Sequence, residues 1–427
     1  MSQFYDGLYN LLVFGFLAAI AYLAWYGWSW YSKTPRAHVQ KRTRQLMTVP
    51  QLLEPASPGK DPSLRFRFQV VKRQGDYEEW LCQLKSGCAP DFMSVAAKYI
   101  TVPLGARSAT WIPDPHNGSL GLLSLTFGPP RVAPARESFL GSPYAPNQLG
   151  WDVSGTQPVS IDIGQASHIL ICGPTGTGKS VFIRNYICAR LLEGVPTQPI
   201  FFDLKQSEFG TLDGEVPGVK VATDYEQAEA LLEKVRAEMK SRQAFMKEQR
   251  KRNPDVVMDV YPISPSKPRL MVVVDEASEL FASGTPEAKK RSERIGEHLT
   301  SLARLGRSAG IELVVGLQRA DVRNLGPSGG DFRDNLAGRV LLGAASRTSL
   351  EMMFSGEDTK NCRIDDSSVK GQAHASSLVK SNGRVMRVPE PIIVPFTSKD
   401  VLVEALVRAD ALVDHSEDAS NFDPDGL

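Results

Sequence analysis

The sequence predicts an α/β protein whose main domain contains a mostly parallel β-sheet with helices on both faces. Two observations support this prediction. After residue 150, strands that are apolar throughout alternate with helical patterns, as expected for strands buried on both faces. A glycine-rich loop also connects one of these strands to a helix, which is the usual setting of a phosphate-binding loop. A small α/β domain and one N-terminal transmembrane helix are predicted ahead of the main domain.

Length and composition limit the classes of protein that fit this chain. Its 427 residues suffice for two or three domains with a sizeable core. Lys plus Arg (49) and Asp plus Glu (48) nearly cancel, so any DNA-binding surface must be a local patch. The five cysteines are odd in number and have no C-x-x-C spacing, which disfavours both a disulfide framework and a metal site.

Residues 1–32 are predicted to form a transmembrane anchor. The run from Leu8 to Tyr31 contains no charged residue and exceeds the roughly 20 apolar residues that a spanning helix needs. Basic residues follow, with no acidic residue before Glu54, so the positive-inside rule places the N-terminus outside and the rest in the cytoplasm. A cleaved signal peptide fits less well, because bulky aromatic residues occupy the end of the run. We therefore expect a single-pass protein of the inner membrane.

The rest of the chain divides at two stretches with little apolar periodicity. Residues 33–60 are basic and then rich in proline, and residues 129–149 are rich in Pro, Gly and Ser, so both are predicted as linkers. Residues 61–128 between them form the predicted small α/β domain, and residues 150–400 form the main domain. Residues 401–427 are predicted as a terminal helix and a disordered acidic tail.

Apolar patterns within the two domains predict the principal strands and helices. In the small domain, strands are expected at 64–73 and 121–127, with a helix at 94–100 between them. In the main domain the predicted strands are 168–172, 199–204, 269–276, 311–317 and 339–343. Its helices are expected from Ser180, from Thr223 or Asp224, and through Ile295, Leu299, Leu302 and Leu305.

The loop after the strand at 168–172 has the P-loop pattern G-x-x-x-x-G-K-S. Such glycines allow backbone N–H groups to close around phosphate oxygens at a helix N-terminus. Lys179 is expected to reach the β- and γ-phosphates of ATP, and Ser180 to ligate Mg²⁺. A glycine-rich turn without a ligand is a weak alternative, because the loop lies between a strand and a helix. The predicted nucleotide-binding residues are Gly173, Pro174, Thr175, Gly176, Thr177, Gly178, Lys179 and Ser180.

Two acidic residues end the strand at 269–276 and complete the predicted catalytic set. Asp275 is placed to hold the magnesium ion through water, and Glu276 to polarise the attacking water. A strand and a helix are inserted between the two motifs, which fits an ATPase whose extra strand separates the P-loop strand from the acidic strand. Gln318, at the tip of the next strand, can contact the γ-phosphate, although an ordinary strand-end residue is an equally good reading.

These residues and their surroundings resemble the FtsK/SpoIIIE family of DNA-pumping motors, within the wider HerA-like ATPases. The resemblance runs from about Gly87 to Pro395, and its most specific stretch is LARLGRSAGIELVVGLQRADV at 302–322. The other matching stretches are LGWDVSG at 149–155, HILICGPTGTGKSV at 168–181, FFDLKQSE at 201–208, VATDYEQAEALLEKVRAEMKSRQAFM at 221–246 and MVVVDEASEL at 271–280. The resemblance implies a RecA-like P-loop motor domain that works as a homo-hexameric ring around double-stranded DNA, with ATP bound between subunits.

The resemblance also implies roles for five arginines. Arg307 matches the arginine finger that reaches a neighbouring subunit's γ-phosphate, and Arg304 is the fallback candidate. DNA-backbone contacts in the pore are expected from Arg319, Arg333 and Arg347, for which a solvated surface position is the competing reading. Contacts to phosphates suit a motor that must hold any sequence.

Some features depart from the family pattern and narrow the expected setting. Leu317 and Ala320 flank the Gln-Arg pair where the family usually has Thr and Pro, and Glu312 replaces a customary His. The large cell-division motors of the family carry several membrane spans and a C-terminal winged helix, whereas one span and an acidic tail are expected here. This difference favours an anchored translocase of a conjugative or mobile element, with a relaxase or other transfer proteins as partners.

Two other functions stay open. The nearest is a conjugative coupling protein that delivers relaxase-bound single-stranded DNA to a secretion channel. A protein-export ATPase with FtsK-like domains is the second, and it fits less well because such chains carry several of these domains in series whereas this one has a single P-loop.

Overall fold

The computed structural model describes most of the chain after residue 34. The described residues are 35–55, 59, 61–89, 92–114, 117–128, 132–141, 143–152, 158–161, 167–253, 258–281, 284–343, 347–354, 371–376, 379–381, 384–385 and 389–415. The predicted span from Leu8 to Tyr31 lies outside them. Within these ranges, no helix is both long enough and apolar enough to cross a membrane. The chain separates into two compact units, Met1–Pro129 and Pro130–Leu427.

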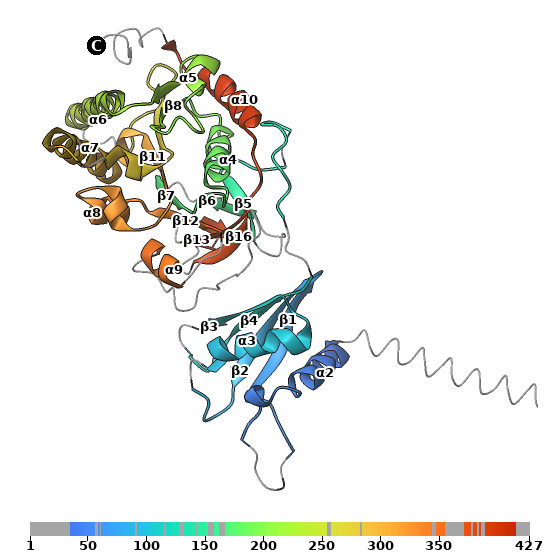
Figure 1. Ribbon diagram of the computed structural model, residues 1–427. Helices are drawn as coiled ribbons and strands as arrows, with labels where there is room; N and C mark the ends of the chain where they lie inside the picture. The colour runs from blue at the N-terminus through green and yellow to red at the C-terminus, as the bar shows by residue number, and fades with distance from the viewer. Residues whose placement is uncertain are drawn as a thin grey trace, which may run out of the picture. The chain divides into compact units, whose positions relative to one another are not determined.

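The first unit contains a four-stranded antiparallel sheet with helices packed on one face (Figure 1). The strand order is β1-β2-β4-β3, with β1 (Phe66–Gln74), β2 (Tyr77–Leu84), β3 (Ser108–Pro113) and β4 (Leu120–Thr126). Helix α3 (Phe92–Leu104) covers the sheet, and its Met93 and Ile100 are buried against Trp80 and Leu123. The two strands and the helix expected in this region are therefore present, and β2 and β3 are additional.

The segment predicted as the first linker differs from that expectation. Helix α2 (Pro35–Leu46) and a short 3₁₀ helix η1 (Pro50–Leu52) occupy most of it. Leu46 and Leu52 are fully buried in the core of the first unit. The buried carboxylate of Glu78 also pairs with His38 and Arg42 of α2, each at 2.9 Å. Leu46 and the buried acid Glu78 thus anchor a helix with few other apolar side chains, and Leu52 anchors η1, which explains why apolar periodicity did not reveal this segment.

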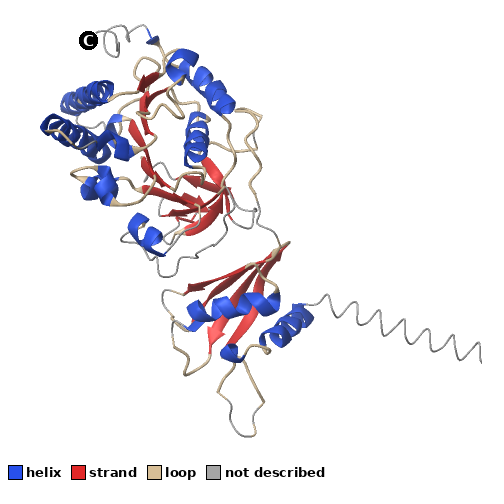
Figure 2. Cartoon of the chain, in the orientation of Figure 1, coloured by secondary structure: helices blue, strands red, loops and turns tan. Residues whose placement is uncertain are grey.

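The second unit is built on one twelve-stranded sheet with a parallel and an antiparallel half (Figure 2). The parallel half, in spatial order, is β12 (Gly338–Leu342), β7 (His168–Cys172), β11 (Ile311–Leu317), β10 (Arg269–Val274), β8 (Thr197–Phe202) and β9 (Lys220–Ala222). Beyond β12 the sheet continues through antiparallel pairs as β13 (Gln372–Ser376), β16 (Glu390–Ile393), β5 (Gln148–Asp152), β6 (Pro158–Ile161), β14 (Val379–Ser381) and β15 (Arg384–Val385). All five strands predicted for this domain lie in the parallel half, and the sequence did not predict the antiparallel half.

Strand β11 lies between the P-loop strand β7 and the acidic strand β10. Leu317 of β11 is in register with Cys172 of β7, and Val315 with Val274 of β10. This order is that of an ATPase with an extra strand between its two motifs, as predicted. Because the carboxyl ends of parallel strands meet at one edge of a sheet, the segments that follow these three strands are neighbours.

Helices cover both faces of the second unit's sheet, so its central strands are buried on both sides. On one face lie α4 (Lys179–Leu191), α5 (Leu212–Glu215) and the terminal helix α10 (Lys399–Asp410). On the other lie α6 (Tyr225–Arg252), α7 (Pro286–Leu305) and α8 (Gly329–Asn335). The predicted start of α6 is confirmed: Asp224 caps it by accepting a hydrogen bond from Gln227 N, while Gln227 Oε1 accepts one from Thr223 N.

The second predicted linker also differs from expectation, because its described residues pack within the second unit. Arg136 is almost fully buried and lies 4.7 Å from the ring centre of Tyr144. Its backbone N–H donates to the carbonyl of Phe396 at 2.8 Å, next to a bridge with Thr397. The segment rich in Pro, Gly and Ser therefore forms a wall of the domain, since a few long side chains and backbone hydrogen bonds hold it there.

Candidate nucleotide-binding site

The predicted P-loop connects β7 to α4 with the backbone that this motif requires. Gly178 caps α4 at a φ of 98°, a left-handed backbone conformation that residues with a Cβ rarely adopt. Gly173 N donates to the carbonyl of Leu317 at 3.0 Å, which ties the start of the loop to β11. The N-terminus of the 13-residue helix α4 therefore opens directly onto the loop, where backbone N–H groups and the helix dipole favour an anion.

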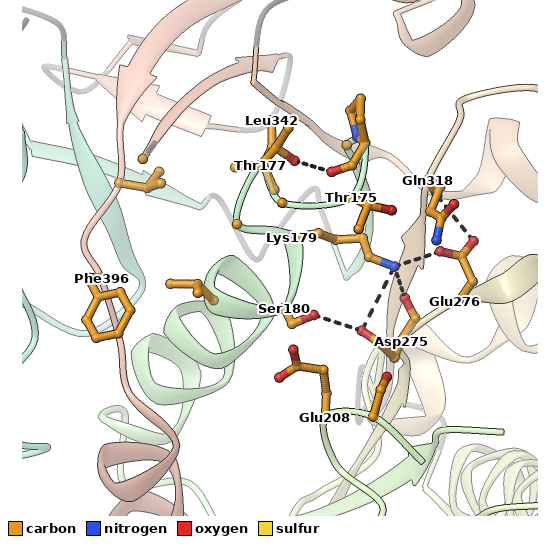
Figure 3. A pocket seen from close by; sticks show the side chains of 18 of the residues that line it. Thr175, Thr177, Lys179, Ser180, Glu208, Asp275, Glu276, Gln318, Leu342 and Phe396 are labelled. Atoms are coloured by element: carbon orange, nitrogen blue, oxygen red, sulfur yellow. Dashed lines mark hydrogen bonds and ion pairs between the residues drawn. The ribbon is translucent and has the colours of Figure 1, made fainter. Parts of the chain in front are cut away.

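The side chain of Lys179 points toward the ends of β10 and β11 (Figure 3). Its Nζ atom lies 2.8 Å from Glu276 Oε2, 2.7 Å from the Asp275 carbonyl oxygen and 4.0 Å from Asp275 Oδ1. The structure therefore brings the predicted phosphate-binding lysine into direct contact with both predicted acids, although 96 residues separate Lys179 from Asp275 in the sequence.

Asp275 and Ser180 face each other at the predicted magnesium site. Ser180 Oγ donates to Asp275 Oδ1 at 3.4 Å, and Asp275 is only 5% exposed. Burial raises the pKa of the Asp275 carboxyl above its usual range; the Lys179 ammonium opposes this rise, and nearby carboxylates including Asp203 and Glu208 add to it. Mg²⁺ prefers oxygen ligands such as a carboxylate and a hydroxyl, and a bound cation would stabilise the ionised form of the buried Asp275 carboxyl. These residues therefore fit Mg²⁺.

Glu276 is held in place on both of its carboxylate oxygens. Besides the contact of Oε2 with Lys179, Oε1 accepts hydrogen bonds from Ser278 Oγ at 2.8 Å and from Gln318 N at 3.2 Å. The link to Gln318 is made by its backbone N–H, whereas its exposed side chain lines the adjoining cavity. Glu276 thus joins the acidic strand to the tip of β11, at Gln318, for which a contact with the γ-phosphate was one of the two predictions.

A cavity of about 640 Å³ is lined by the whole P-loop, both acids and Gln318. Sequence reasoning missed some of its walls. The loop after β8 contributes Lys205 and Glu208, and the buried carboxylate of Asp203 holds this loop by accepting from the backbone N–H groups of residues 208, 209 and 210. The stretch FFDLKQSE at 201–208 was a signal for this loop, although it assigned no role. Val132 and Phe396 also line the cavity, and no sequence pattern pointed to either of them.

The predicted arginine finger lies away from this cavity. Arg307 begins the 3₁₀ helix η3 (Arg307–Ala309), which precedes β11, whereas Gln318 follows β11. A seven-residue strand separates them, or about 20 Å along the sheet. Arg307 is exposed, and its guanidinium makes no hydrogen bond or ion pair with any residue that the structure describes. Its role toward a neighbouring subunit stays a prediction, and contact with its own cavity is excluded by this distance.

The three arginines predicted to contact DNA lie on three different segments. Arg319 is exposed immediately after Gln318 at the end of β11. Arg333 lies on α8 and forms an ion pair with its neighbour Asp334 at 3.0 Å. Arg347 begins α9 (Arg347–Met353), and its side chain is outside what the structure describes. Of the three, Arg319 is therefore next in sequence to a residue that lines the cavity.

Together, these observations define a P-loop ATPase domain: a phosphate loop between β7 and α4, two acids after β10, and an extra strand between β7 and β10. The particular family follows from a comparison with known proteins. Residues 136–322 match the model of the FtsK/SpoIIIE family, and this part of the chain is an FtsK/SpoIIIE-family P-loop ATPase domain. The expected family is thus confirmed, and the match covers the P-loop, both acids, Arg307 and Gln318.

Curated relatives include DNA translocases named FtsK. That of Staphylococcus aureus (strain Mu50) is 28% identical over 296 residues, covering 66% of this chain and 35% of the relative. That of Helicobacter pylori (strain 26695) is 32% identical over 219 residues, covering 50% of this chain and 24% of the relative. The chain thus spans about a third or less of the length of these relatives. Among solved structures, the pCW3 conjugation coupling protein TcpA, in monomer form with ATPγS, has a similar fold; the TM-score is 0.54 at 21% identity, covering 85% of this chain and 95% of that one.

Proposed function

We propose that this protein is an ATP-driven DNA translocase that works as a ring, with the second unit as its motor. The observation that supports this most strongly is the convergence of Lys179, Ser180, Asp275 and Glu276 in one cavity of an FtsK/SpoIIIE-family domain. These are the groups that ATP cleavage needs: a lysine for the β- and γ-phosphates, hard oxygen ligands for Mg²⁺, and a carboxylate to orient and deprotonate water.

Hydrolysis would begin with an exchange of partners at Lys179. The lysine ammonium now contacts Glu276 at 2.8 Å, and a triphosphate carries more negative charge than this one carboxylate. The ammonium would therefore turn toward the phosphates, and Glu276 Oε2 would become available to accept a proton from the attacking water. Mg²⁺ held by Ser180 and, through water, by Asp275 would neutralise charge on the phosphate oxygens.

Coupling to DNA would pass through the end of β11. Glu276 Oε1 accepts from the backbone of Gln318, and Arg319 is the next residue. A movement of the Glu276 carboxylate would thus be transmitted to Gln318, and the next residue, Arg319, is an exposed cation that can contact a DNA phosphate. Contacts of this kind hold any sequence, and they weaken as salt concentration rises.

The ring arrangement places each cavity at a seam between subunits. Arg307 lies at the opposite end of β11 from its own cavity and has no partner among the described residues, so it is free to complete the site of a neighbour. A hexamer is the assembly that the resemblance implies. We propose further that residues 1–32 anchor the ring in the inner membrane, with the motor in the cytoplasm.

The setting we favour is DNA transfer by a conjugative or mobile element. It is supported by the likeness in fold to a conjugation coupling protein. The same likeness keeps the second candidate open, in which the protein delivers relaxase-bound single-stranded DNA to a secretion channel.

ATPase rates measured with different DNA substrates test this proposal and separate its two forms. The purified protein should hydrolyse ATP slowly alone and faster with duplex DNA, and the stimulation should fall as salt is raised. Greater stimulation by single-stranded DNA would favour the coupling protein. Turnover that is indifferent to every polynucleotide would remove DNA translocation altogether.

A further inference from the structure

Two large apolar side chains are exposed to solvent and also line the nucleotide cavity. Phe396 is 59% exposed and Val132 is 67% exposed. The other large apolar side chains that the described residues leave exposed do not line this cavity. Exposed apolar side chains are common when scattered over a surface, but two that line one ligand cavity indicate a contact with an apolar part of the ligand.

The backbone around Phe396 is fixed by contacts from two directions. Its carbonyl accepts from Arg136 N at 2.8 Å, and the carbonyl of the next residue, Thr397, accepts from Arg184 Nε at 2.9 Å. Arg184 belongs to α4, the helix that begins at the P-loop. The exposed ring is therefore held relative to the phosphate-binding loop by a rigid element, which is a condition for a precise binding contact.

The ring also lies on the appropriate side of the P-loop. In Figure 3, Phe396 lies across the start of α4 from Asp275 and Glu276, which lie on the far side of Lys179. A triphosphate whose terminal phosphate meets Lys179 and the two acids extends away from them along the loop. Its nucleoside end therefore enters the part of the cavity that Phe396 borders.

We propose that the Phe396 ring stacks on the purine base of the bound nucleotide, with Val132 contributing a further apolar contact. This inference rests on the proposed function and adds how the base is held. The described lining residues next to Phe396 in the fold are Leu342, Gly371, Val394 and Pro395, and they contribute no polar side chain. Recognition then comes from the face of the base rather than from its edge, because every purine presents a π-face to an aromatic ring. The site accepts adenine and guanine nucleotides alike.

Calorimetric titration of the full chain with ATP, GTP and inorganic tripolyphosphate tests the stack. Phe396→Ala should weaken ATP and GTP by a similar factor, on the order of tenfold to a hundredfold for the loss of one base–aromatic stack. Binding of tripolyphosphate, which has no base, should be unchanged. Phe396→Tyr should retain the affinity of the wild type, and wild-type affinities for ATP and GTP should be comparable.

Phe245→Ala provides the matched control, because Phe245 is 42% exposed on α6 and does not line the cavity. It should leave all three affinities unchanged. Unaltered ATP binding in Phe396→Ala would overturn the stack, and an equal loss of tripolyphosphate binding would show that Phe396 acts on the P-loop instead. A strong preference of the wild type for one purine would show that the base edge is read. A wild-type chain that binds neither ATP nor tripolyphosphate would overturn the nucleotide site itself, so the two failures are distinguishable.

Discussion

The Nζ atom of Lys179 lies 2.8 Å from Oε2 of Glu276, so the P-loop lysine and the acid at the end of β10 form an ion pair. Both side chains are largely shielded from water, at 11% and 3% exposed, and each offsets part of the other's cost of burial. Removing Glu276 leaves the ammonium of Lys179 with one carboxylate contact among the described residues, the longer one to Asp275 Oδ1, at 4.0 Å. This contact also suggests how ATP would prepare the site for hydrolysis. Phosphates that attract the ammonium of Lys179 would release the carboxylate of Glu276.

Replacement of Glu276 by Gln is expected to abolish ATP turnover while nucleotide binding persists. The amide keeps the size of the side chain but cannot accept the proton of the attacking water, a contribution of about 10²–10⁴-fold in rate. Steady-state phosphate release and equilibrium ATP binding measure the two effects separately. Glu248→Gln, on the exposed face of α6, serves as the control and should leave both unchanged. Substantial turnover by Glu276→Gln would assign the proton transfer to another group.

Replacement of Asp275 by Asn is expected to stabilise the protein at neutral pH while it removes magnesium-dependent hydrolysis. Burial raises the pKa of this carboxyl, so the folded state disfavours its ionised form. The gain should be roughly 1 kcal/mol, as for other single stabilising changes. Because protonation removes the burial cost, wild-type stability relative to Asp275→Asn should recover as the pH falls through the raised pKa. Thermal unfolding of both proteins across this pH range measures the difference in stability. A variant less stable than the wild type at pH 7 would contradict this prediction.

The buried acid Glu312 is expected to stabilise the second unit through its pair with Arg190 at 2.8 Å. Burial opposes ionisation of Glu312, but the charge and hydrogen bonds of Arg190, the charge of Arg269 and the hydrogen bond from Tyr186 lower its pKa to about 2. Glu312→Gln should cost about 3–5 kcal/mol, because it leaves a buried guanidinium undercompensated. With a folded pKa below the unfolded value, this stability is present above about pH 4.5 and is lost as the pH falls toward 2.

The exposed pair of Arg252 and Glu248 offers a matched comparison for Glu312. Its partners also lie within ion-pair distance, at 3.2 Å, but both are at least half exposed. Glu248→Gln should change stability by less than about 1 kcal/mol. Urea unfolding of the two variants measures the difference, and equal effects would show that the burial of Glu312 contributes nothing.

Gly316 is expected to be irreplaceable by alanine. A Cβ on this residue of β11 would lie 2.0 Å from the carbonyl oxygen of Asp275, the same oxygen that accepts from Lys179. Relief of this overlap requires the two strands to move apart, at a cost of about 1–3 kcal/mol or more. Gly214→Ala is the control, since its Cβ would meet nothing within 4 Å. Melting temperatures and ATP binding of the two variants test this, and a Gly316→Ala protein with unaltered binding would contradict the close approach.

The parallel half of the sheet could be predicted from the sequence because its strands are apolar on both faces. The pattern at 168–172 and at 311–317 marked strands whose bounds agree with β7 and β11. The antiparallel half escaped because its strands are short, as with Arg384–Val385, or begin within stretches rich in turn residues, as with Gln148–Asp152. Such strands depend on neighbours distant in sequence, which periodicity does not report.

The site could be predicted from the sequence where a residue type suited to ATP hydrolysis directly follows an apolar strand. Lys179, Asp275 and Glu276 follow apolar strands, and the rule that parallel strands end at one edge of a sheet brings them together. Phe396 could not be found in this way. It follows an antiparallel strand, and its exposure beside the P-loop depends on Arg136 and Arg184, which hold its segment from elsewhere in the chain.

The central claim, that ATP cleavage at a seam between subunits pulls on DNA, is tested most directly by triplex displacement with mixed rings. Wild-type protein is mixed with increasing shares of Arg307→Ala, and ATP-dependent release of a third strand from duplex DNA is followed. We expect release by the wild type and a loss that exceeds the variant's share, because each altered subunit disables the site of a neighbour in a ring that works as a unit. A loss in strict proportion to that share, or no release by the wild type, would contradict the account.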